Sequence, residues 1–109
     1  MNCKVEITEH FSKEAKRLAK KFPSLKQDLE ALFIDISANP TLGTSLGMDV
    51  YKVRMAISSK GKGKRGGARI ITFFRAKSDL VVLLSIYNKG EKNTITADEI
   101  KQLLNQMVK

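Results

Sequence analysis

The stretch ARIITFFRAKSDLVVLLSIY, residues 68–87, decides the fold. Its two outer parts, residues 68–75 and 80–87, are rich in the β-branched and aromatic residues that favour strands. The polar run Ala76-Lys77-Ser78-Asp79 separates them and has the length and composition of a hairpin loop. We therefore predict a β-hairpin of two adjacent antiparallel strands.

Two more strands are expected upstream of this hairpin. Val5 and Ile7 alternate with polar residues near the start of the chain. From Val50 onward apolar residues again follow a period of two, with Lys52 and Arg54 on the opposite face. The apolar members of this second strand are Tyr51, Val53, Met55 and Ile57. Residues 41–49, which include two glycines, are expected to form a loop.

Three segments have the spacing of amphipathic helices. The first two span residues 11–22 and 25–36, with a capping box from Ser24 and Gln27 and an end at Asn39-Pro40, and form a helical hairpin. The third begins with a capping box of Thr96 and Glu99. The apolar positions are Phe11, Ala15, Leu18, Ala19 and Phe22; Leu25, Leu29, Leu32, Phe33 and Ile36; and Ile100, Leu103, Leu104, Met107 and Val108.

The predicted order is β-α-α-β-β-β-α in a single α+β domain that spans residues 1–109. We expect a mostly antiparallel sheet with the helices packed on one face and the opposite face free for function. The chain has 42% hydrophobic and 28% charged residues, one cysteine, and no segment long and apolar enough for a membrane span or a signal peptide. A cytoplasmic protein without membrane contact is therefore expected.

The positive charge of the chain is concentrated in one segment. The net charge is +9, yet residues 50–78 contain nine Lys and Arg and no Asp or Glu, while the rest of the chain is balanced. A polyanion would neutralise this segment and release counterions, so nucleic acid is the expected partner. A solvated basic surface without a ligand is the alternative. The nine residues are Lys52, Arg54, Lys60, Lys62, Lys64, Arg65, Arg69, Arg75 and Lys77.

Residues 61–66, GKGKRG, match the GxGxxG pattern of dinucleotide-binding turns, but that assignment is rejected. Such a turn follows a strand and opens a helix, whereas this one leads into another strand. We expect residues 58–67, which hold four of the seven glycines, to form a mobile loop without regular structure. Its basic residues Lys60, Lys62, Lys64 and Arg65 are suited to phosphate contacts, or else keep a hairpin tip soluble.

Several classes of catalysis are excluded by missing residues. His10 is the only histidine, so a paired-histidine ribonuclease mechanism is impossible. Cys3 has no histidine partner nearby in the sequence, and residues 50–78 lack the carboxylates that would hold magnesium. No metal and no small-molecule cofactor is therefore expected.

Alternation also places Arg69, Phe73 and Arg75 on one face of the hairpin. If Lys52 and Arg54 share that face, the sheet presents a cationic surface on which Phe73 could stack a base. An ordinary core position is the alternative for Phe73.

Three segments resemble the RelE/ParE toxin superfamily, and within it the HigB/RelE-type toxins. They are Tyr51-Lys52-Val53-Arg54, then Gly66-Gly67-Ala68-Arg69-Ile70-Ile71-Thr72, then Leu84-Ser85-Ile86-Tyr87-Asn88-Lys89-Gly90-Glu91. The resemblance runs from the first strand to the last helix.

The resemblance implies a toxin of a type II toxin–antitoxin system that cleaves mRNA on the ribosome by attack of a ribose 2′-OH on the scissile phosphate. It implies catalytic roles for Arg65, Arg69, Tyr87, Lys89 and Glu91. Which of the last three residues acts as the acid and which as the base is left undecided. The surrounding cations are expected to favour the phenolate of Tyr87. Phosphate contacts are expected from Lys52, Arg54, Lys60, Lys62, Lys64 and Arg75. The expected partners are the ribosome, mRNA and a cognate antitoxin of helix-turn-helix type. A ParE-type gyrase inhibitor and a non-catalytic RNA-binding module are the alternatives.

Overall fold

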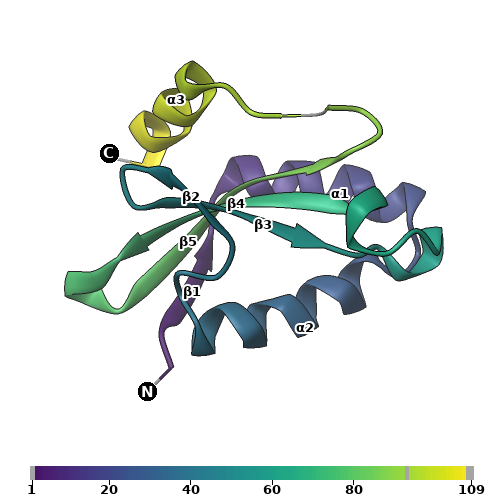
Figure 1. Ribbon diagram of the computed structural model, residues 1–109, viewed down its shortest axis with the longest axis horizontal. Helices are drawn as coiled ribbons and strands as arrows, with labels where there is room; N and C mark the ends of the chain where they lie inside the picture. Colours follow the sequence, from purple (N-terminus) through teal and green to yellow (C-terminus); the bar gives the residue numbers. More distant parts are fainter. Residues whose placement is uncertain (1, 93, 108–109) are drawn as a thin grey trace.

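The computed structural model describes residues 2–92 and 94–107. Two helices lie against one face of a central twisted sheet, and the third helix stands on the other side (Figure 1). The strands are β1 (Lys4–Ile7), β2 (Thr44–Gly47), β3 (Val50–Met55), β4 (Ala68–Arg75) and β5 (Leu80–Asn88). The α-helices are α1 (Glu9–Lys21), α2 (Leu25–Ala38) and α3 (Ala97–Met107).

The sheet has five strands in the order β1-β5-β4-β3-β2. The predicted hairpin of residues 68–87 is confirmed, and its strands β4 and β5 form the middle of the sheet. β1 pairs with β5 in parallel, and all other pairs are antiparallel. The expected α+β architecture with a mostly antiparallel sheet is therefore confirmed.

The expectation of a loop over residues 41–49 is wrong in part, because these residues contain the short edge strand β2. Gly47, Met48 and Asp49 all have positive φ angles, of 86°, 55° and 61°. This left-handed backbone reverses the chain tightly, so β2 folds back onto β3. Only Gly47 carries the sequence signal for such a turn.

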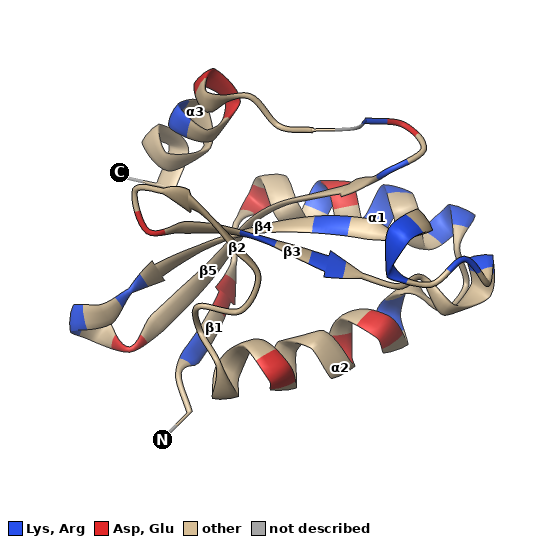
Figure 2. Cartoon of the chain, in the orientation of Figure 1, with Lys and Arg blue, Asp and Glu red and all other residues tan. Residues whose placement is uncertain are grey.

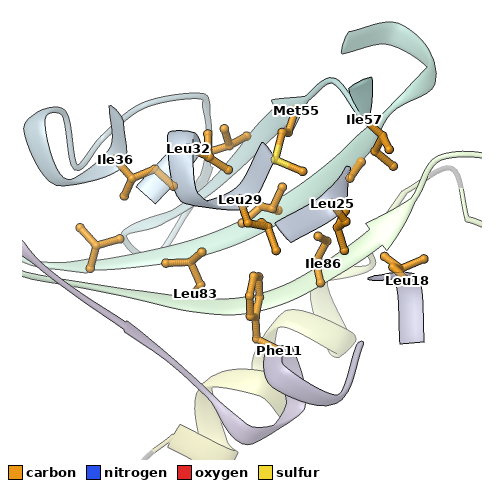
Figure 3. Packing of buried hydrophobic residues seen from close by; sticks show 14 residues of the cluster. Phe11, Leu18, Leu25, Leu29, Leu32, Ile36, Met55, Ile57, Leu83 and Ile86 are labelled. Atoms are coloured by element: carbon orange, nitrogen blue, oxygen red, sulfur yellow. The ribbon is translucent and has the colours of Figure 1, made fainter. Parts of the chain in front are cut away.

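The main hydrophobic core lies between the sheet and the helices α1 and α2 (Figure 3). The two helices run in opposite directions along the sheet, as the predicted helical hairpin requires (Figure 1). Phe11 and Leu18 of α1 and Leu25 and Ile36 of α2 are almost completely buried, in agreement with the predicted spacing. Fully burying side chains of this kind stabilises a fold by about 1.5–3 kcal/mol each.

The expectation that all helices pack on one face is wrong for α3. Ile100 and Leu103 of this helix pack with Val50, Ile71 and Leu84 on the opposite face of the sheet. The strands carry apolar residues on both faces, so part of the second face also needs a cover. The face that was expected to be free is therefore covered in part by α3.

β5 contains an extra residue that changes which side chains share a face. Ile71 pairs with Ser85 and Thr72 pairs with Leu83, so Leu84 forms a bulge. Beyond the bulge the alternation is inverted, and Tyr87 lies on the α3 side with Leu84 instead of on the α1 and α2 side with Leu83. The bulge thereby brings Tyr87 opposite Arg69.

The sequence predicted a capping box at the start of two of the three helices, and one of these two predictions is confirmed. The capping box of α3 is confirmed, since the amide of Thr96 donates to Glu99 Oε1 at 3.0 Å and the amide of Glu99 donates to Thr96 Oγ1 at 3.1 Å. The box of Ser24 and Gln27 is wrong, because Ser24 has helical backbone angles and its hydroxyl donates to Asp28.

Two further expectations can be compared with the structure only over the residues that it describes. Val108, expected on the apolar face of the last helix, lies outside them. Within residues 2–92 and 94–107, none of the helices has the length and apolar character that crossing a membrane requires.

Candidate active site

Four cations surround a cleft at one end of the sheet. Lys60, Lys62, Arg65 and Lys89 line it together with Gly66 and Gly90, and its volume is about 400 Å³. We call these four residues the cleft cations. Figure 2 shows how blue segments gather at this end, on the tips of β3 and β4 and on the loops beside them. None of the described residues that line the cleft carries a carboxylate, so it is suited to an anion.

The loop that carries three of these residues is more ordered than the sequence predicts. It contains two single 3₁₀ turns, Ser58–Lys60 and Lys64–Gly66. The first turn is fixed to α2, because Asp28 accepts hydrogen bonds from the Ser58 amide at 2.9 Å and the Ser58 hydroxyl at 2.6 Å. Partial burial alone would raise the pKa of Asp28. The hydrogen bonds from Ser58 and Ser24 outweigh this effect, so the pKa lies below its usual value. The position of Lys60 is therefore held by an ionised carboxylate.

Two glycines, Gly66 and Gly67, precede β4, and the close packing of the backbone requires the second of them. A Cβ atom here would lie 2.0 Å from the carbonyl oxygen of Met55, so only glycine lets the two backbones come this close. The Gly67 carbonyl accepts a hydrogen bond from the amide of Lys89 at 3.1 Å. This contact joins the basic loop to the segment after β5. These two segments form the two sides of the cleft.

Arg69 is buried beneath the cleft, with 4% of its surface exposed. Its Nη1 donates to the carbonyls of Lys64 at 2.8 Å and Ala68 at 3.1 Å, and its Nη2 donates to that of Arg65 at 3.1 Å. Burial, with some repulsion from Arg54, lowers the pKa of this guanidinium. In this geometry Arg69 holds the second 3₁₀ turn and presents little surface to a ligand.

Tyr87 is also buried, in the core that α3 covers, with 3% of its surface exposed. Its hydroxyl is enclosed and has no hydrogen-bond partner among the described residues. Burial raises the pKa of Tyr87, an effect that Arg69 opposes and Glu99 supports. The expectation that neighbouring cations favour the phenolate is therefore wrong, because desolvation outweighs them.

Lys60 differs from the other cleft cations because it is half-buried. Its Nζ donates to Oδ1 of the buried Asn88 at 2.9 Å and lies 5.4 Å from the centre of the Phe22 ring. Burial and repulsion from Lys62 and Lys21 lower the pKa of Lys60, and Glu91 opposes this effect. Asn88 of β5 was not expected at the site, and Phe22 at the end of α1 was expected only on the apolar face of the first helix.

Glu91 lies beside the cleft and forms an ion pair with Arg17 of α1, at 3.1 Å between Nη1 and Oε2. This pair attaches the segment after β5 to the first helix. The following residue, Lys92, bonds to Glu99 and lies 5.4 Å from the centre of the Tyr87 ring. Arg17 was missed because nothing in the sequence links α1 to that segment.

The remaining predicted site residues lie apart from the cleft. Lys52, Arg54 and Lys64 line a separate groove of about 930 Å³ between α2 and β3. Arg54 pairs across the sheet with Arg69, as expected for residues of one face. Arg75 is at the opposite end of β4, where its guanidinium lies 5.8 Å from the centre of the Phe73 ring. Phe73 is half-buried against the α3-side core, so the structure favours the core alternative for it.

Comparison with known proteins identifies the family. Residues 3–108 match the family described as the RelE toxin of the RelE/RelB toxin–antitoxin system. The chain belongs to the RelE toxin family.

Solved structures of RelE proteins share the fold. A free Escherichia coli RelE variant matches with a TM-score of 0.65 and 15% identity, and the match covers 99% of this chain and 100% of that one. A chain of a RelBE toxin–antitoxin complex from Mycobacterium tuberculosis matches with a TM-score of 0.61 and 20% identity, over 81% of this chain and 99% of that one. A chain of the intact E. coli RelBE complex gives 0.59 and 17%, over 79% and 95%. The cleft of this RelE-family chain therefore lies on an established toxin fold.

Proposed function

We propose that this RelE-family toxin is a ribosome-dependent endoribonuclease that cleaves mRNA. The observation that carries the proposal is the cleft, which four cations line and to which the described part of the chain contributes no carboxylate. Gly66 and Gly90 in its wall allow a phosphate to approach the backbone closely. All four cleft cations are side chains that stabilise the negative charge of a phosphodiester.

The reaction that fits these groups is an intramolecular transesterification of RNA, in which the phosphate moves from the 5′-oxygen to the ribose 2′-oxygen. The ribose 2′-oxygen attacks the adjacent phosphorus, the bond to the 5′-oxygen breaks, and the products are a 2′,3′-cyclic phosphate and a 5′-hydroxyl. Such a reaction needs charge stabilisation at the phosphate and correct alignment of the 2′-oxygen. The ribosome holds the mRNA, so the toxin itself can supply few groups.

The catalytic residues suggested by the family resemblance divide into three groups. Arg65 and Lys89 are exposed in the cleft and contact the scissile phosphate. Arg69 and Tyr87 act from below, where Arg69 fixes the carbonyls of the loop and Tyr87 packs beside it under α3. Glu91 is paired with Arg17 and keeps the segment of Lys89 in place. Lys62 and Lys64 contact neighbouring phosphates.

A cognate antitoxin is the proposed second partner. Two of the similar structures are complexes of a toxin with its antitoxin. Because the cleft is cationic, an antitoxin that presents carboxylates to it, or that prevents entry into the ribosome, would inhibit the toxin.

The test is primer-extension mapping of a reporter mRNA in a cell-free translation reaction with the purified toxin. We expect cuts that require translating ribosomes, and at least about tenfold less cleavage with Arg65→Ala and with Lys89→Ala. Lys77→Ala, which removes a cation at the far end of β4, is the matched control and cuts normally. Intact mRNA and unimpaired translation with the wild-type protein would overturn the proposal and favour the gyrase alternative.

A further inference from the structure

We propose that Lys60 is the general acid of this cleft, which gives its ammonium proton to the departing 5′-oxygen, and that Asn88 is the residue that positions it. The inference rests on the proposed function, since it assigns one step of that reaction. Lys60 was expected only to contact phosphate, and Asn88 had no expected role.

The first argument is that Lys60 has a fixed position. Its turn is tied to α2 through Asp28 and through the Ser59 amide, which donates to Ser24 Oγ at 2.8 Å. The Asn88 amide is itself oriented, because Oδ1 accepts from the Gly90 amide at 3.3 Å as well as from Lys60. A proton donor must be held within hydrogen-bond reach of its target, and this arrangement provides that.

The second argument comes from comparing Lys60 with the other cleft cations. Arg65 carries a guanidinium, a group that binds phosphate well and is a poor proton donor. Lys62 and Lys89 are exposed, whereas Lys60 is half-buried between the Phe22 ring and Asn88. Burial lowers the pKa of Lys60 because it disfavours the charged ammonium, and this favours release of the proton.

The charged groups around Lys60 act in opposite directions. Lys62 lies on its own loop and Lys21 on α1, and both repel its ammonium, while Glu91 after β5 attracts it. Glu91 is shared with Arg17, which limits this attraction. A bound phosphate would add a second attraction and keep the proton on Lys60 until the leaving oxygen takes it.

The step is balanced without any added reagent. The 2′-hydroxyl loses its proton to water as its oxygen bonds to phosphorus. The bond between phosphorus and the 5′-oxygen breaks, and that oxygen takes the proton of Lys60. The neutral amine of Lys60 then regains a proton from solvent, so the toxin is unchanged.

The test is single-turnover cleavage of ribosome-bound mRNA at a mapped site, with Lys60→Arg against the wild type. Arginine keeps the positive charge but does not release a proton, so we expect a rate at least about 100-fold lower. Affinity for single-stranded RNA should change less than about twofold. Lys21→Arg is the matched control, because Lys21 also lies over the Phe22 ring, at 5.8 Å from its centre, but does not line the cleft.

A modified substrate separates proton donation from a structural role. With sulfur in place of the scissile 5′-oxygen, the leaving group is a thiolate that needs little protonation, since thiols have a pKa near 8.5. This substrate should restore most of the rate lost in Lys60→Arg. A variant that is slow only because the loop has moved would stay slow.

The pH profile supplies the second readout. The wild-type rate should fall at high pH as Lys60 loses its proton, and Lys60→Arg should lack this fall. Asn88→Asp places a carboxylate beside the ammonium, so the fall should move to higher pH. Cleavage by Lys60→Arg at the wild-type rate would overturn this inference and leave the proposed function standing. Failure of the wild type to cut would overturn both.

Discussion

The two sides of the site contrast in burial although both are built from the same two segments, the basic, glycine-rich residues 60–69 and residues 87–89 around the end of β5. The buried side consists of Gly67, Arg69, Tyr87 and Asn88, each at the start of β4 or the end of β5, and we call it the frame. The other side is the set of cleft cations, of which three are exposed and one is half-buried. The same residue type therefore has two tasks, since Arg69 bonds to backbone carbonyls while Arg65 faces the cleft.

The contrast shows that the burial of a basic residue, more than its charge, indicates its role. A buried guanidinium that donates three hydrogen bonds to carbonyls contributes to the fold and to the shape of the loop. An exposed cation contributes little to stability and remains available to a ligand. Variants of the frame should therefore lower stability, whereas variants of the cleft should lower RNA binding.

The largest effect is expected from Gly67→Ala. The new Cβ would overlap the Met55 carbonyl oxygen, and backbone atoms cannot move aside easily, so the free energy of unfolding should fall by about 3 kcal/mol or more. Urea denaturation followed by circular dichroism measures this. Gly90→Ala is the control, because its Cβ would meet no atom closer than 3.7 Å, and should stay within about 0.5 kcal/mol of wild type. Equal losses in both variants would contradict the close approach at Gly67.

Arg69→Ala should have the next largest effect. It removes the guanidinium that donates to the carbonyls of Lys64, Ala68 and Arg65, so we expect a loss of about 2–4 kcal/mol in the same denaturation experiment. Arg65→Ala removes an exposed guanidinium and should change stability by less than about 0.5 kcal/mol. If both variants were equally stable, Arg69 would not belong to the frame.

A smaller effect is expected when one cleft cation is removed. Each phosphate neutralised on a single strand contributes about −0.7 to the slope of log K against log salt concentration, so four cleft cations predict a slope of about −3. Lys62→Ala should make this slope shallower by about 0.7, while Lys77→Ala at the far end of β4 should not change it. Fluorescence anisotropy with a labelled RNA oligonucleotide across a salt series gives both slopes. A slope near zero for the wild type would remove the electrostatic argument for the cleft.

The smallest effect concerns Glu99, which holds the start of α3 over Tyr87. Its hydrogen bonds with Lys92 and Thr96 lower its pKa in the folded protein. A depressed pKa means that the stabilisation is present above the pKa of the unfolded chain and is lost as the pH falls through the folded value. Because Glu99 is 39% exposed, the contribution should be only about 0.5 kcal/mol. Unfolding of wild type and Glu99→Gln should therefore differ at pH 7 and converge by about pH 3.

The sequence predicted the elements well where a local pattern determined them. The alternation in residues 50–57, the β-branched and aromatic residues of 68–75 and 80–87, the helical spacing of Phe11, Leu18, Leu25 and Ile36, and the Thr96 capping box all depend on neighbours in the chain. The strand β2 and the placement of α3 were missed, because the first needs three consecutive left-handed residues and the second depends on which sheet face lacks a cover.

The site was predicted by residue type and not by geometry. The structure brings Lys60, Lys62, Arg65 and Lys89 together around one cleft, and their contact with phosphate stays a prediction. Burial of Arg69 and Tyr87, and the contacts of Lys60 with Asn88 and Phe22, join residues that are far apart in the sequence. No periodicity within a single strand could have shown them.

The bulge at Leu84 also affects how related chains should be compared. Because it inverts the alternation along β5, residues 80–84 and 86–88 follow opposite rules for which positions face α3. An alignment that allows no gap at this point would place a core residue of one relative against the counterpart of Tyr87 in another. A relative without the extra residue would need its aromatic side chain one position away to reach the same neighbours. The bulge thus marks the place where strand β5 can gain or lose a residue while the fold stays the same and the site is rebuilt.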